Sequence, residues 1–341
     1  MVRKVGDSAK LPIVERDAGG LAPVRDVEFI AMPTKQILNR CSNPNLRFQW
    51  TINPYRGCEF GCVYCYARYT HEFLELRDPL DFERRIFVKE RAAEALARNF
   101  AHTAVGAGQI ALGTATDPYQ PAERRFGLTR AMLAVMARLG GLDLSITTKS
   151  GLIVRDLDLL GEINARSRLS VNFSLITLDR RLQRALEPRA PRPSLRLGAL
   201  ARLAAAGIRC NVLMMPMIPG ITDDPRGVEA VMRAARRAGA ANVWHRALFL
   251  KPAAARRFIP FVREKFPALA ARFEDYYGRS AYAPRAYDER LDALFAMLKR
   301  RCGFDAEASR GMGHASPAPP DGIAQRQLVL GVAPDGAAGR H

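Results

Sequence analysis

The sequence predicts an α/β fold, a partial (β/α)6 barrel of the TIM type with a helical C-terminal extension. Short β-rich runs alternate with longer helical patterns six times, and the strand pattern stops after residue 250. Because repeated strand–helix alternation produces parallel strands joined by right-handed crossovers, this order favours one parallel sheet or barrel. The expected strands are 48–52, 109–114, 142–148, 169–176, 209–215 and 241–248, and the expected helices are 89–101, 126–139, 155–165, 193–206 and 225–238.

Helix 126–139 illustrates the periodicity behind these assignments. Leu128, Met132 and Met136 form one apolar stripe, and Gly140 follows where a C-terminal cap belongs. After residue 250 the pattern is helical only, and its last helix carries a second apolar stripe that includes Tyr287. The chain is therefore expected to divide into an irregular N-terminal lead-in (1–45), the α/β core (46–250), a helical extension (251–304) and a Gly-, Ala- and Pro-rich disordered tail (305–341).

Composition excludes several classes of protein. Hydrophobic residues make up 48% and charged residues 25% of the 341 residues, which is ordinary globular usage. No uncharged apolar run approaches the roughly 18 residues needed to span a bilayer. The first thirty residues contain no apolar block, so a secretory signal is not expected and the predicted location is cytoplasmic. Six cysteines are too few for a disulfide scaffold, so a cluster among them needs a chemical reason.

The charge balance is strongly basic. The formal net charge is +18, from 52 Lys and Arg against 34 Asp and Glu. Residues 180–210 contain eight arginines and a single acid, Glu187. Such a segment can contact the phosphates of a nucleic acid, which makes nucleic acid a possible partner through 180–210. A solvated basic face is the alternative interpretation.

Three of the six cysteines fall within eight residues. Cys58, Cys62 and Cys65 have the spacing Cys-x3-Cys-x2-Cys in GCEFGCVYCYAR, on a glycine-containing loop just after an expected strand. Thiolates this close together can converge on one metal centre. Three cysteines cannot pair completely as disulfides, and disulfides are rare in a reducing cytosol.

Two metal centres are compatible with this spacing. A structural zinc site needs four ligands, and His71 could complete a Cys3His set. A [4Fe–4S] cluster is normally held by four thiolates, so three would leave one iron open to another ligand, as a reactive cluster requires. The alternative to an enzyme is thus a non-enzymatic, zinc-stabilised protein that binds nucleic acid.

The cysteine spacing, with Tyr64 before the third cysteine, resembles that of the radical S-adenosylmethionine (SAM) enzymes. Over about residues 40–250 the chain resembles their spore photoproduct lyase-related branch, often labelled DNA repair photolyase. This implies a partial barrel of the radical SAM type. The segments that carry the resemblance are NPYRGCEFGCVYCYAR (53–68), THEF (70–73), GTATDPYQPAE (113–123), TTKS (147–150), LEPRAP (186–191) and PGITD (219–223).

The resemblance also implies a chemistry. Cys58, Cys62 and Cys65 would ligate three irons of a [4Fe–4S] cluster, and the amino and carboxylate groups of SAM would chelate the fourth. Reductive cleavage of SAM would give methionine and a 5′-deoxyadenosyl radical, which abstracts a hydrogen atom from a substrate that the sequence does not identify. The electron would come from a flavodoxin- or ferredoxin-like donor. No membrane partner is expected.

Residues at strand ends are the candidate SAM contacts, because reactive groups of a βα barrel lie at the C-terminal ends of its strands. The resemblance implies that Lys149 pairs with the SAM carboxylate and that Ser174 hydrogen-bonds the same end. It also implies that Thr116 and Asp117 take the place of residues that bind the amino group. The main chain around Tyr64 and around residues 216–218 would flank the adenine. Each polar side chain could instead cap a turn or lie at the surface.

One position departs from the family pattern. Spore photoproduct lyase carries a hydrogen-donating cysteine near the end of its second strand, where this chain has Thr114 and Ala115. Repair of thymine dimers by that route is therefore not expected, and no catalytic residue is assigned. His245 is expected either to face the site or to pack. The remaining cysteines, expected to be small buried hydrophobes, are Cys41, Cys210 and Cys302.

Overall fold

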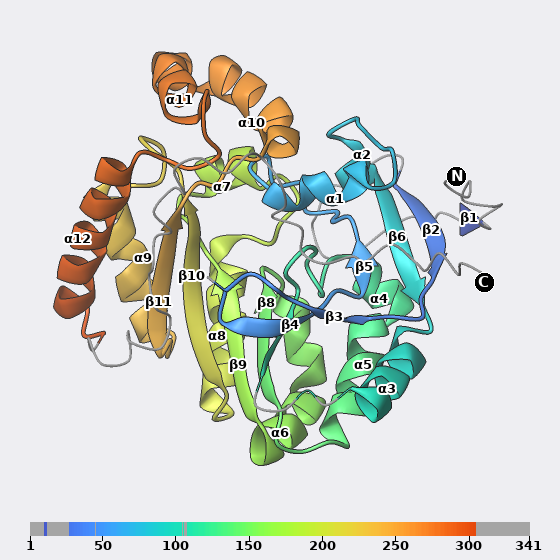
Figure 1. Ribbon diagram of the computed structural model, residues 1–341. Helices are drawn as coiled ribbons and strands as arrows, with labels where there is room; N and C mark the ends of the chain where they lie inside the picture. Colours follow the sequence, from blue (N-terminus) through green and yellow to red (C-terminus); the bar gives the residue numbers. More distant parts are fainter. Residues whose placement is uncertain (1–9, 12–26, 45, 104, 106–107, 305–341) are drawn as a thin grey trace.

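Six strands lie parallel and in chain order within a seven-stranded sheet, as the computed structural model in Figure 1 shows. A seventh strand, β3, pairs antiparallel with β4 at one edge. The structure describes residues 10–11, 27–44, 46–103, 105 and 108–304. The strands of this sheet are β3 (Leu38–Arg40), β4 (Phe48–Ile52), β7 (Gln109–Leu112), β8 (Asp143–Thr148), β9 (Arg168–Ser174), β10 (Arg209–Met217) and β11 (Asn242–Ala247).

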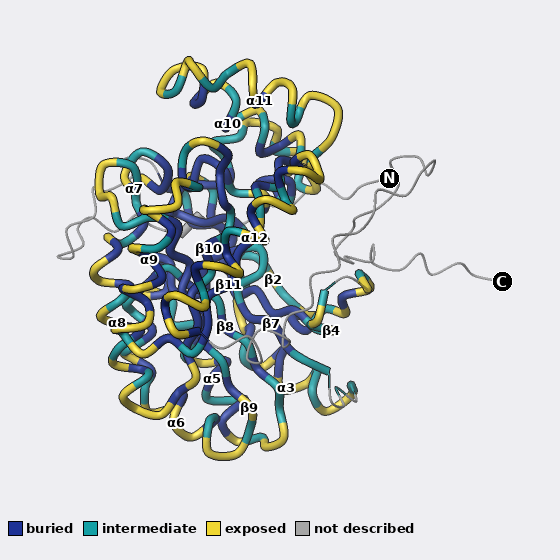
Figure 2. Tube along the Cα trace, turned by 90° about the vertical axis from the view of Figure 1, so that its left-hand side faces the viewer, coloured by how far each residue is buried: buried dark blue, intermediate teal, exposed yellow. Residues whose placement is uncertain are grey.

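Helices cover the outer face of this sheet, and each joins one parallel strand to the next. Figure 2 shows buried strands behind helices whose outward sides are exposed. The partial (β/α)6 barrel predicted from the sequence is therefore confirmed. The crossover helices are α3 (Ala92–His102), α4 (Ala122–Phe126), α5 (Leu128–Ala137), η2 (Gly151–Asp156), α6 (Leu157–Arg166), α7 (Arg180–Leu186), α8 (Pro193–Ala205) and α9 (Pro225–Arg237).

The barrel core is made of the apolar residues that gave the sequence its periodicity. Met132 and Met136 of α5 are fully buried against strand residues such as Ile146 and Val171. Completely burying one such side chain stabilises the fold by roughly 1.5–3 kcal/mol. The apolar stripe of α5 therefore anchors that helix to the sheet.

A second, smaller sheet lies beside the barrel and was not predicted. Its order is β1-β2-β6-β5, with β2 parallel to β6. Strands β2 and β3 lie in the lead-in that was expected to be irregular, so that expectation was wrong for these residues. They were missed because their apolar residues follow no clear period of two. The strands are β1 (Lys10–Leu11), β2 (Glu28–Pro33), β5 (Tyr55–Arg56) and β6 (Arg85–Glu90).

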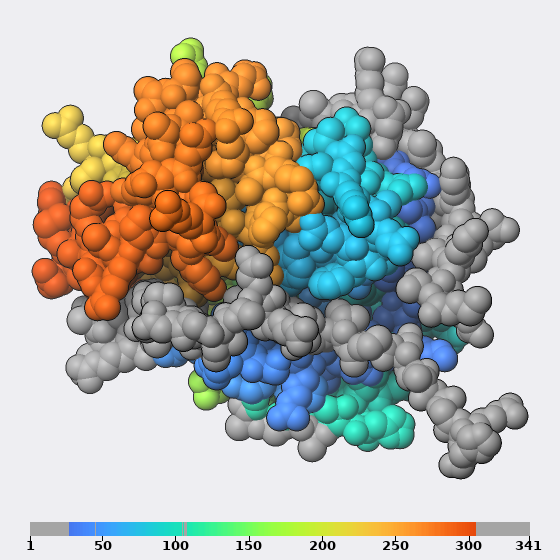
Figure 3. Space-filling model, turned by 45° about the horizontal axis from the view of Figure 1, so that its top comes forward, coloured from blue at the N-terminus to red at the C-terminus, as the bar shows by residue number. Residues whose placement is uncertain are grey.

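The chain after β11 is helical, as expected. Helix α12 packs on β11 and α9, with Tyr287 and Phe295 buried. Helix α10 packs on η1 and α1, so that orange and cyan surfaces adjoin in Figure 3. The predicted tail, 305–341, lies outside the described residues. These helices are η1 (Tyr66–Arg68), α1 (Tyr69–Glu72), α2 (Asp81–Arg84), α10 (Pro252–Lys265), η3 (Pro267–Leu269), α11 (Ala270–Tyr277) and α12 (Arg285–Arg301).

Within the described part of the chain, a search for helices with the length and apolar character of a membrane span finds none.

Candidate functional site

A cavity of about 460 Å³ opens at the C-terminal ends of the barrel strands. Its size lies within the range of small-molecule and cofactor sites, roughly 300–1,000 Å³. It is lined by the cysteine loop after β4 and by residues at the ends of β7 to β11. All eight site residues predicted from the sequence are among its lining: Cys58, Cys62, Tyr64, Cys65, Thr116, Asp117, Lys149 and Ser174.

The cysteine loop is fixed by its own backbone. Cys58 donates its N–H to the carbonyl of Phe82 at 2.9 Å, and Val63 donates to Leu186 at 3.0 Å. Cys58 and Cys62 are buried and Cys65 is partly exposed, all as free thiols. The loop therefore presents three thiols on one wall of the cavity.

The thiols lie in surroundings that disfavour a bare negative charge. Burial raises the pKa of Cys62 to about 12, although the nearby Lys149 ammonium group lowers it. Burial, and then the charge of Asp117, raise the pKa of Cys58 well above its usual range. A thiolate is stable here only beside a cation, and metal ligation supplies that charge. The donor set therefore suits a metal centre.

The zinc alternative is not supported by the position of His71. Its Nε2 lies 2.9 Å from the carbonyl oxygen of Arg85, and its ring packs edge-on to Phe82 and Phe87. His71 does not line the cavity. In the described ranges, no three His, Cys, Asp or Glu side chains are arranged to hold a single metal ion. A [4Fe–4S] cluster places each thiolate on a different iron, so it needs no such convergence on one point.

His71 is expected to make stability depend on pH. Burial lowers its pKa to about 4, although the hydrogen bond to Arg85 raises it. The pKa of the histidine in the unfolded chain is about 6.5, so between that pH and about 4 only the unfolded chain binds the proton. The contribution of neutral His71 to stability is therefore complete above about pH 6.5 and is lost as the pH falls to about 4. Urea unfolding should show a slope of up to about 1.4 kcal/mol per pH unit from this residue. The variant His71→Gln should lack that slope, and identical pH dependence in the two proteins would contradict this.

A buried ion-pair network supports the cysteine loop from behind. Arg68 and Arg189 both pair with Glu83, whose side chain is 4% exposed. Arg68 also donates from Nη2 to the carbonyl of Cys62 at 2.8 Å, and Arg189 donates to the carbonyl of Glu59. The two arginines thus join α2, the cysteine loop and the segment after α7.

Replacement of Gly61 by alanine is expected to damage this network. Gly61 has φ of +63°, which costs a residue with a Cβ about 1–2 kcal/mol. A Cβ there would overlap the guanidinium of Arg189 and the carboxylate of Glu83. We expect Gly61→Ala to lower the unfolding free energy by at least about 2 kcal/mol and to reduce iron incorporation. Gly161→Ala is the control, because a Cβ at that helical position meets open space.

Lys149, at the end of β8, carries a stabilised positive charge. Burial alone would lower the pKa of Lys149, but Cys62 and Glu187 raise it above its ordinary value. Its Nζ lies 4.0 Å from Oε1 of Glu187 and 5.9 Å from the ring centre of Tyr64. The cavity is therefore lined by an ammonium group that suits an anionic ligand group.

Glu187 and Arg196 were not identified from the sequence. Glu187 is fully buried, pairs with the equally buried Arg196 and accepts from the hydroxyl of Tyr64. Arg196 also donates from Nη1 to the carbonyl of Ser174 at 2.9 Å. The available signal was that Glu187 is the only acid in the arginine-rich segment. Together these residues position Lys149 and Ser174 on the cavity wall.

Three other predicted SAM contacts, Asp117, Thr116 and Ser174, differ in the hydrogen bonds that their side chains already make within the protein. Asp117 accepts from the hydroxyl of Thr148 and the N–H of Lys149, both at 2.7 Å. Thr116 donates its hydroxyl to the carbonyl of Gly57 at 2.6 Å. The hydroxyl of Ser174 makes no hydrogen bond with the part of the chain that the structure describes. Ser174 is thus the freest of these three side chains to bind a ligand.

Four further residues singled out in the sequence, a histidine and three cysteines, are buried. His245 lies 2.8 Å from Asp292 and stacks on Phe295, so it packs against α12. Cys210 and Cys302 are buried, as expected. Cys41 is buried as well, but it also lines the cavity.

The eight arginines of 180–210 do not form one basic face. Arg189 and Arg196 are used in the buried ion pairs described above. The remaining six are exposed, but α7 follows the C-terminal end of β9 whereas Arg209 begins β10 at the opposite end of the barrel. The charge of this segment is therefore spread over two ends of the molecule.

The fold and the three-cysteine cavity define a class of protein, and the sequence comparison identifies it. Residues 52–246, more than half of the chain, match the Radical SAM superfamily. The chain therefore belongs to the radical SAM superfamily and is a radical SAM enzyme, as predicted.

Its relatives in sequence include proteins without an assigned activity. The uncharacterized protein Rv2578c of Mycobacterium tuberculosis is 33% identical over 321 residues, which is 92% of each chain. The uncharacterized protein MJ0683 of Methanocaldococcus jannaschii is 29% identical over 197 residues, covering 58% of this chain and 70% of that protein.

Solved structures show the same fold. A spore photoproduct lyase variant with bound AdoMet and dinucleoside spore photoproduct superposes with a TM-score of 0.57 at 16% identity, covering 80% of this chain and 79% of that one. A second variant of the same enzyme has a TM-score of 0.58 at 15% identity and the same coverage. At this identity the likeness concerns the fold, which is the one predicted for this chain.

Proposed function

We propose that Cys58, Cys62 and Cys65 hold a [4Fe–4S] cluster and that SAM binds beside it in the same cavity. The observation that carries this proposal is the gathering of three free thiols and the five predicted SAM contacts around one cavity of about 460 Å³. When bound, the cluster and SAM would supply a reductively generated 5′-deoxyadenosyl radical that removes a hydrogen atom from a substrate.

The protein's own groups would bind, orient and shield. The ammonium group of Lys149 attracts a carboxylate, and its charge is maintained by Glu187. Ser174 lines the same cavity, and its hydroxyl is available for a hydrogen bond. Tyr64 and Phe60 contribute apolar surface, which limits the access of water to a reactive species.

SAM cleavage tests the proposal. Protein reconstituted anaerobically with iron and sulfide and reduced with dithionite should convert SAM to 5′-deoxyadenosine. Lys149→Met should weaken SAM binding by at least about tenfold while iron content stays unchanged, because one charge-assisted contact is lost. Lys265→Met, on the exposed end of α10, is the matched control. No 5′-deoxyadenosine from cluster-loaded protein would contradict the proposal.

Two partners are proposed on chemical grounds. A flavodoxin- or ferredoxin-like protein would deliver the electron, because the chemistry needs a one-electron reductant. Nucleic acid would bind through the exposed arginines of α7, Arg180, Arg181 and Arg184. Binding of DNA or RNA should then weaken steeply with salt and lose that dependence when these arginines are neutralised. Binding that ignores salt would argue against a nucleic-acid partner.

A further inference from the structure

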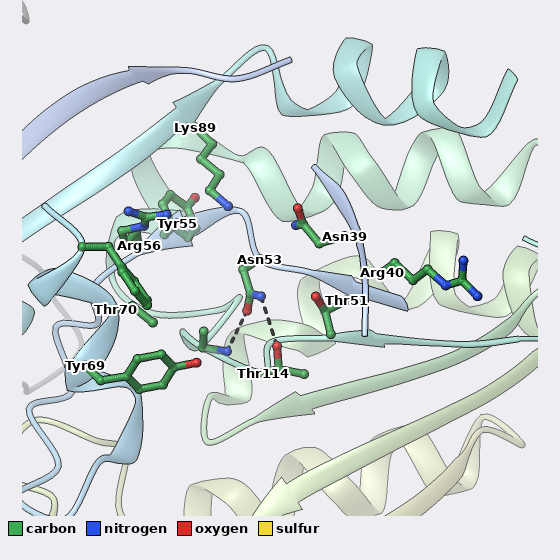
Figure 4. A pocket seen from close by; sticks show the side chains of 12 residues that line it. Asn39, Arg40, Thr51, Asn53, Tyr55, Arg56, Tyr69, Thr70, Lys89 and Thr114 are labelled. Carbon is green, nitrogen blue, oxygen red and sulfur yellow. Dashed lines mark hydrogen bonds between the residues drawn. The ribbon is translucent and has the colours of Figure 1, made fainter. Parts of the chain in front are cut away.

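A second, smaller cavity adjoins the first. Its volume is about 70 Å³, enough for one small tetrahedral ion, and it lies where β5 and β6 of the smaller sheet adjoin β3 and β4 of the barrel sheet (Figure 4). Tyr69, Thr114 and Ala115 line both cavities, so a group held in the small one lies beside the large one.

Three cationic residues line this space: Lys89, Arg56 and Arg40. Figure 4 shows the guanidinium of Arg40 directed away from Lys89 and Arg56. Lys89 of β6 and Arg56 of β5 line the cavity, and Figure 4 shows the amino end of Lys89 directed into it. Neither side chain makes a hydrogen bond or ion pair with the described part of the chain. No Asp or Glu is among the residues that line the cavity. Enclosed cations are normally paired, so this arrangement needs a reason.

The pKa of Lys89 responds to the charge around it. Burial, followed by the positive charge of Arg56, lowers the pKa of Lys89 to about 7. An anion between the two side chains would relieve their repulsion and favour the charged form of Lys89. The charged form of Lys89 is therefore disfavoured by burial and by Arg56 unless an anion lies beside it.

Neutral donors and a fixed wall complete the cavity. Asn53 donates from Nδ2 to the hydroxyl of Thr114 and accepts from the N–H of Ala115, which holds the shared wall in place. Figure 4 shows the hydroxyl of Tyr69 directed toward the Thr114 segment of this wall. The ammonium group of Lys251 lies 3.9 Å from the centre of the Tyr69 ring. The residues shared by the two cavities are therefore held in place by Asn53 and by Lys251.

We propose that Lys89 and Arg56 form an oxyanion subsite that binds a phosphate group of the substrate. The assignment to the substrate rests on the proposed function, because the subsite adjoins the cavity assigned to the cluster and SAM. Lys89 and Arg56, beside a cavity of about 70 Å³, suit one tetrahedral phosphate, and both a terminal phosphate and a phosphodiester present that chemistry.

Inorganic phosphate is the probe for this subsite. It should be titrated into cluster-loaded protein at constant ionic strength, with binding followed by ³¹P line widths. Lys89→Met should weaken phosphate binding by at least about tenfold, whereas Lys265→Met should change it less than about twofold. Unchanged affinity in Lys89→Met, or an equal loss in Lys265→Met, would overturn the proposal.

The phosphate titration is interpretable only if Lys89→Met folds, so a second measurement uses the unaltered protein. Lys89→Met should keep its iron content and thermal midpoint, because methionine removes a buried charge and keeps the apolar stem. Should that variant fail to fold, crystals of the unaltered protein soaked in tungstate decide the matter by anomalous scattering. Tungstate between Lys89 and Arg56 supports the subsite, and its absence there overturns it.

Competition identifies the source of the phosphate. Displacement of inorganic phosphate by a nucleoside 5′-monophosphate supports a terminal phosphate, and displacement by a dinucleoside phosphodiester supports a nucleic-acid backbone. If neither compound displaces inorganic phosphate, the assignment of the subsite to a phosphate group of the substrate is overturned. SAM cleavage without substrate does not need this subsite, so Lys89→Met should retain it. Loss of SAM cleavage in all variants would count against the proposed function and leave the phosphate result standing.

Discussion

Cys62→Ala is expected to abolish both the cluster and SAM cleavage. Cys62 is the central thiol of the loop, and its carbonyl is held by Arg68. The variant keeps only two thiols on this loop, Cys58 and Cys65, which leaves the proposed cluster one ligand short. Iron and sulfide analysis after anaerobic reconstitution should show loss of nearly all bound iron, and 5′-deoxyadenosine should fall to background.

Cys210→Ala is the matched control for this loss. Cys210 is buried in β10 and belongs to the barrel core, away from the cavity lining. Its truncation leaves a small void, so it should cost some stability while preserving iron content and SAM cleavage. Equal iron content in the Cys62 and Cys210 variants would contradict the assignment of the cluster loop.

Glu187→Ala is expected to give the largest loss of stability. The substitution leaves the buried Arg196 guanidinium without its partner and removes the acceptor of the Tyr64 hydroxyl. Breaking a buried ion pair by removing one partner costs about 3–5 kcal/mol. Urea unfolding measures this directly. Glu229→Ala is the control, because its pairs with Arg233 and Arg301 are at the surface and should contribute far less.

The ion pair of Glu187 and Arg196 is also expected to make folding stability depend on pH in the acid range. Burial raises the pKa of Glu187, but Arg196 and Lys149 outweigh it and hold the pKa below its usual value. Its stabilisation is therefore complete above the unfolded carboxyl value of about 4.3 and is lost as the pH falls through the folded value. At neutral pH, Glu187→Ala should have a lower free energy of unfolding than the unaltered protein. In acid, the two free energies should become similar, because the carboxylate of the unaltered protein is then protonated.

The barrel could be predicted because its strands are buried, β-rich runs separated by amphipathic helices. Strand β4 lies at the predicted residues, and the other five parallel strands differ by a few residues at their ends. The second sheet could not be predicted in this way. The pairing of β2 with β6 joins segments far apart in the chain, and no local pattern records it.

The site was predicted in part for a related reason. The cysteine spacing and the strand-end residues are local features, and all eight line one cavity. Glu187, Arg196 and Glu83 act through ion pairs between distant segments, which no local pattern records. Lys89 and Arg56 gave no signal either, because their role depends on a cavity that forms only when the two sheets meet.

Electron paramagnetic resonance of the dithionite-reduced, reconstituted protein tests the central claim most directly. In the proposed arrangement, Cys58, Cys62 and Cys65 would hold three irons and would leave the fourth open to SAM. The spectrum should show a reduced [4Fe–4S] signal that changes when SAM is added, and Lys149→Met should need more SAM for the same change. Absence of a cluster signal, or a signal indifferent to SAM, would contradict the account.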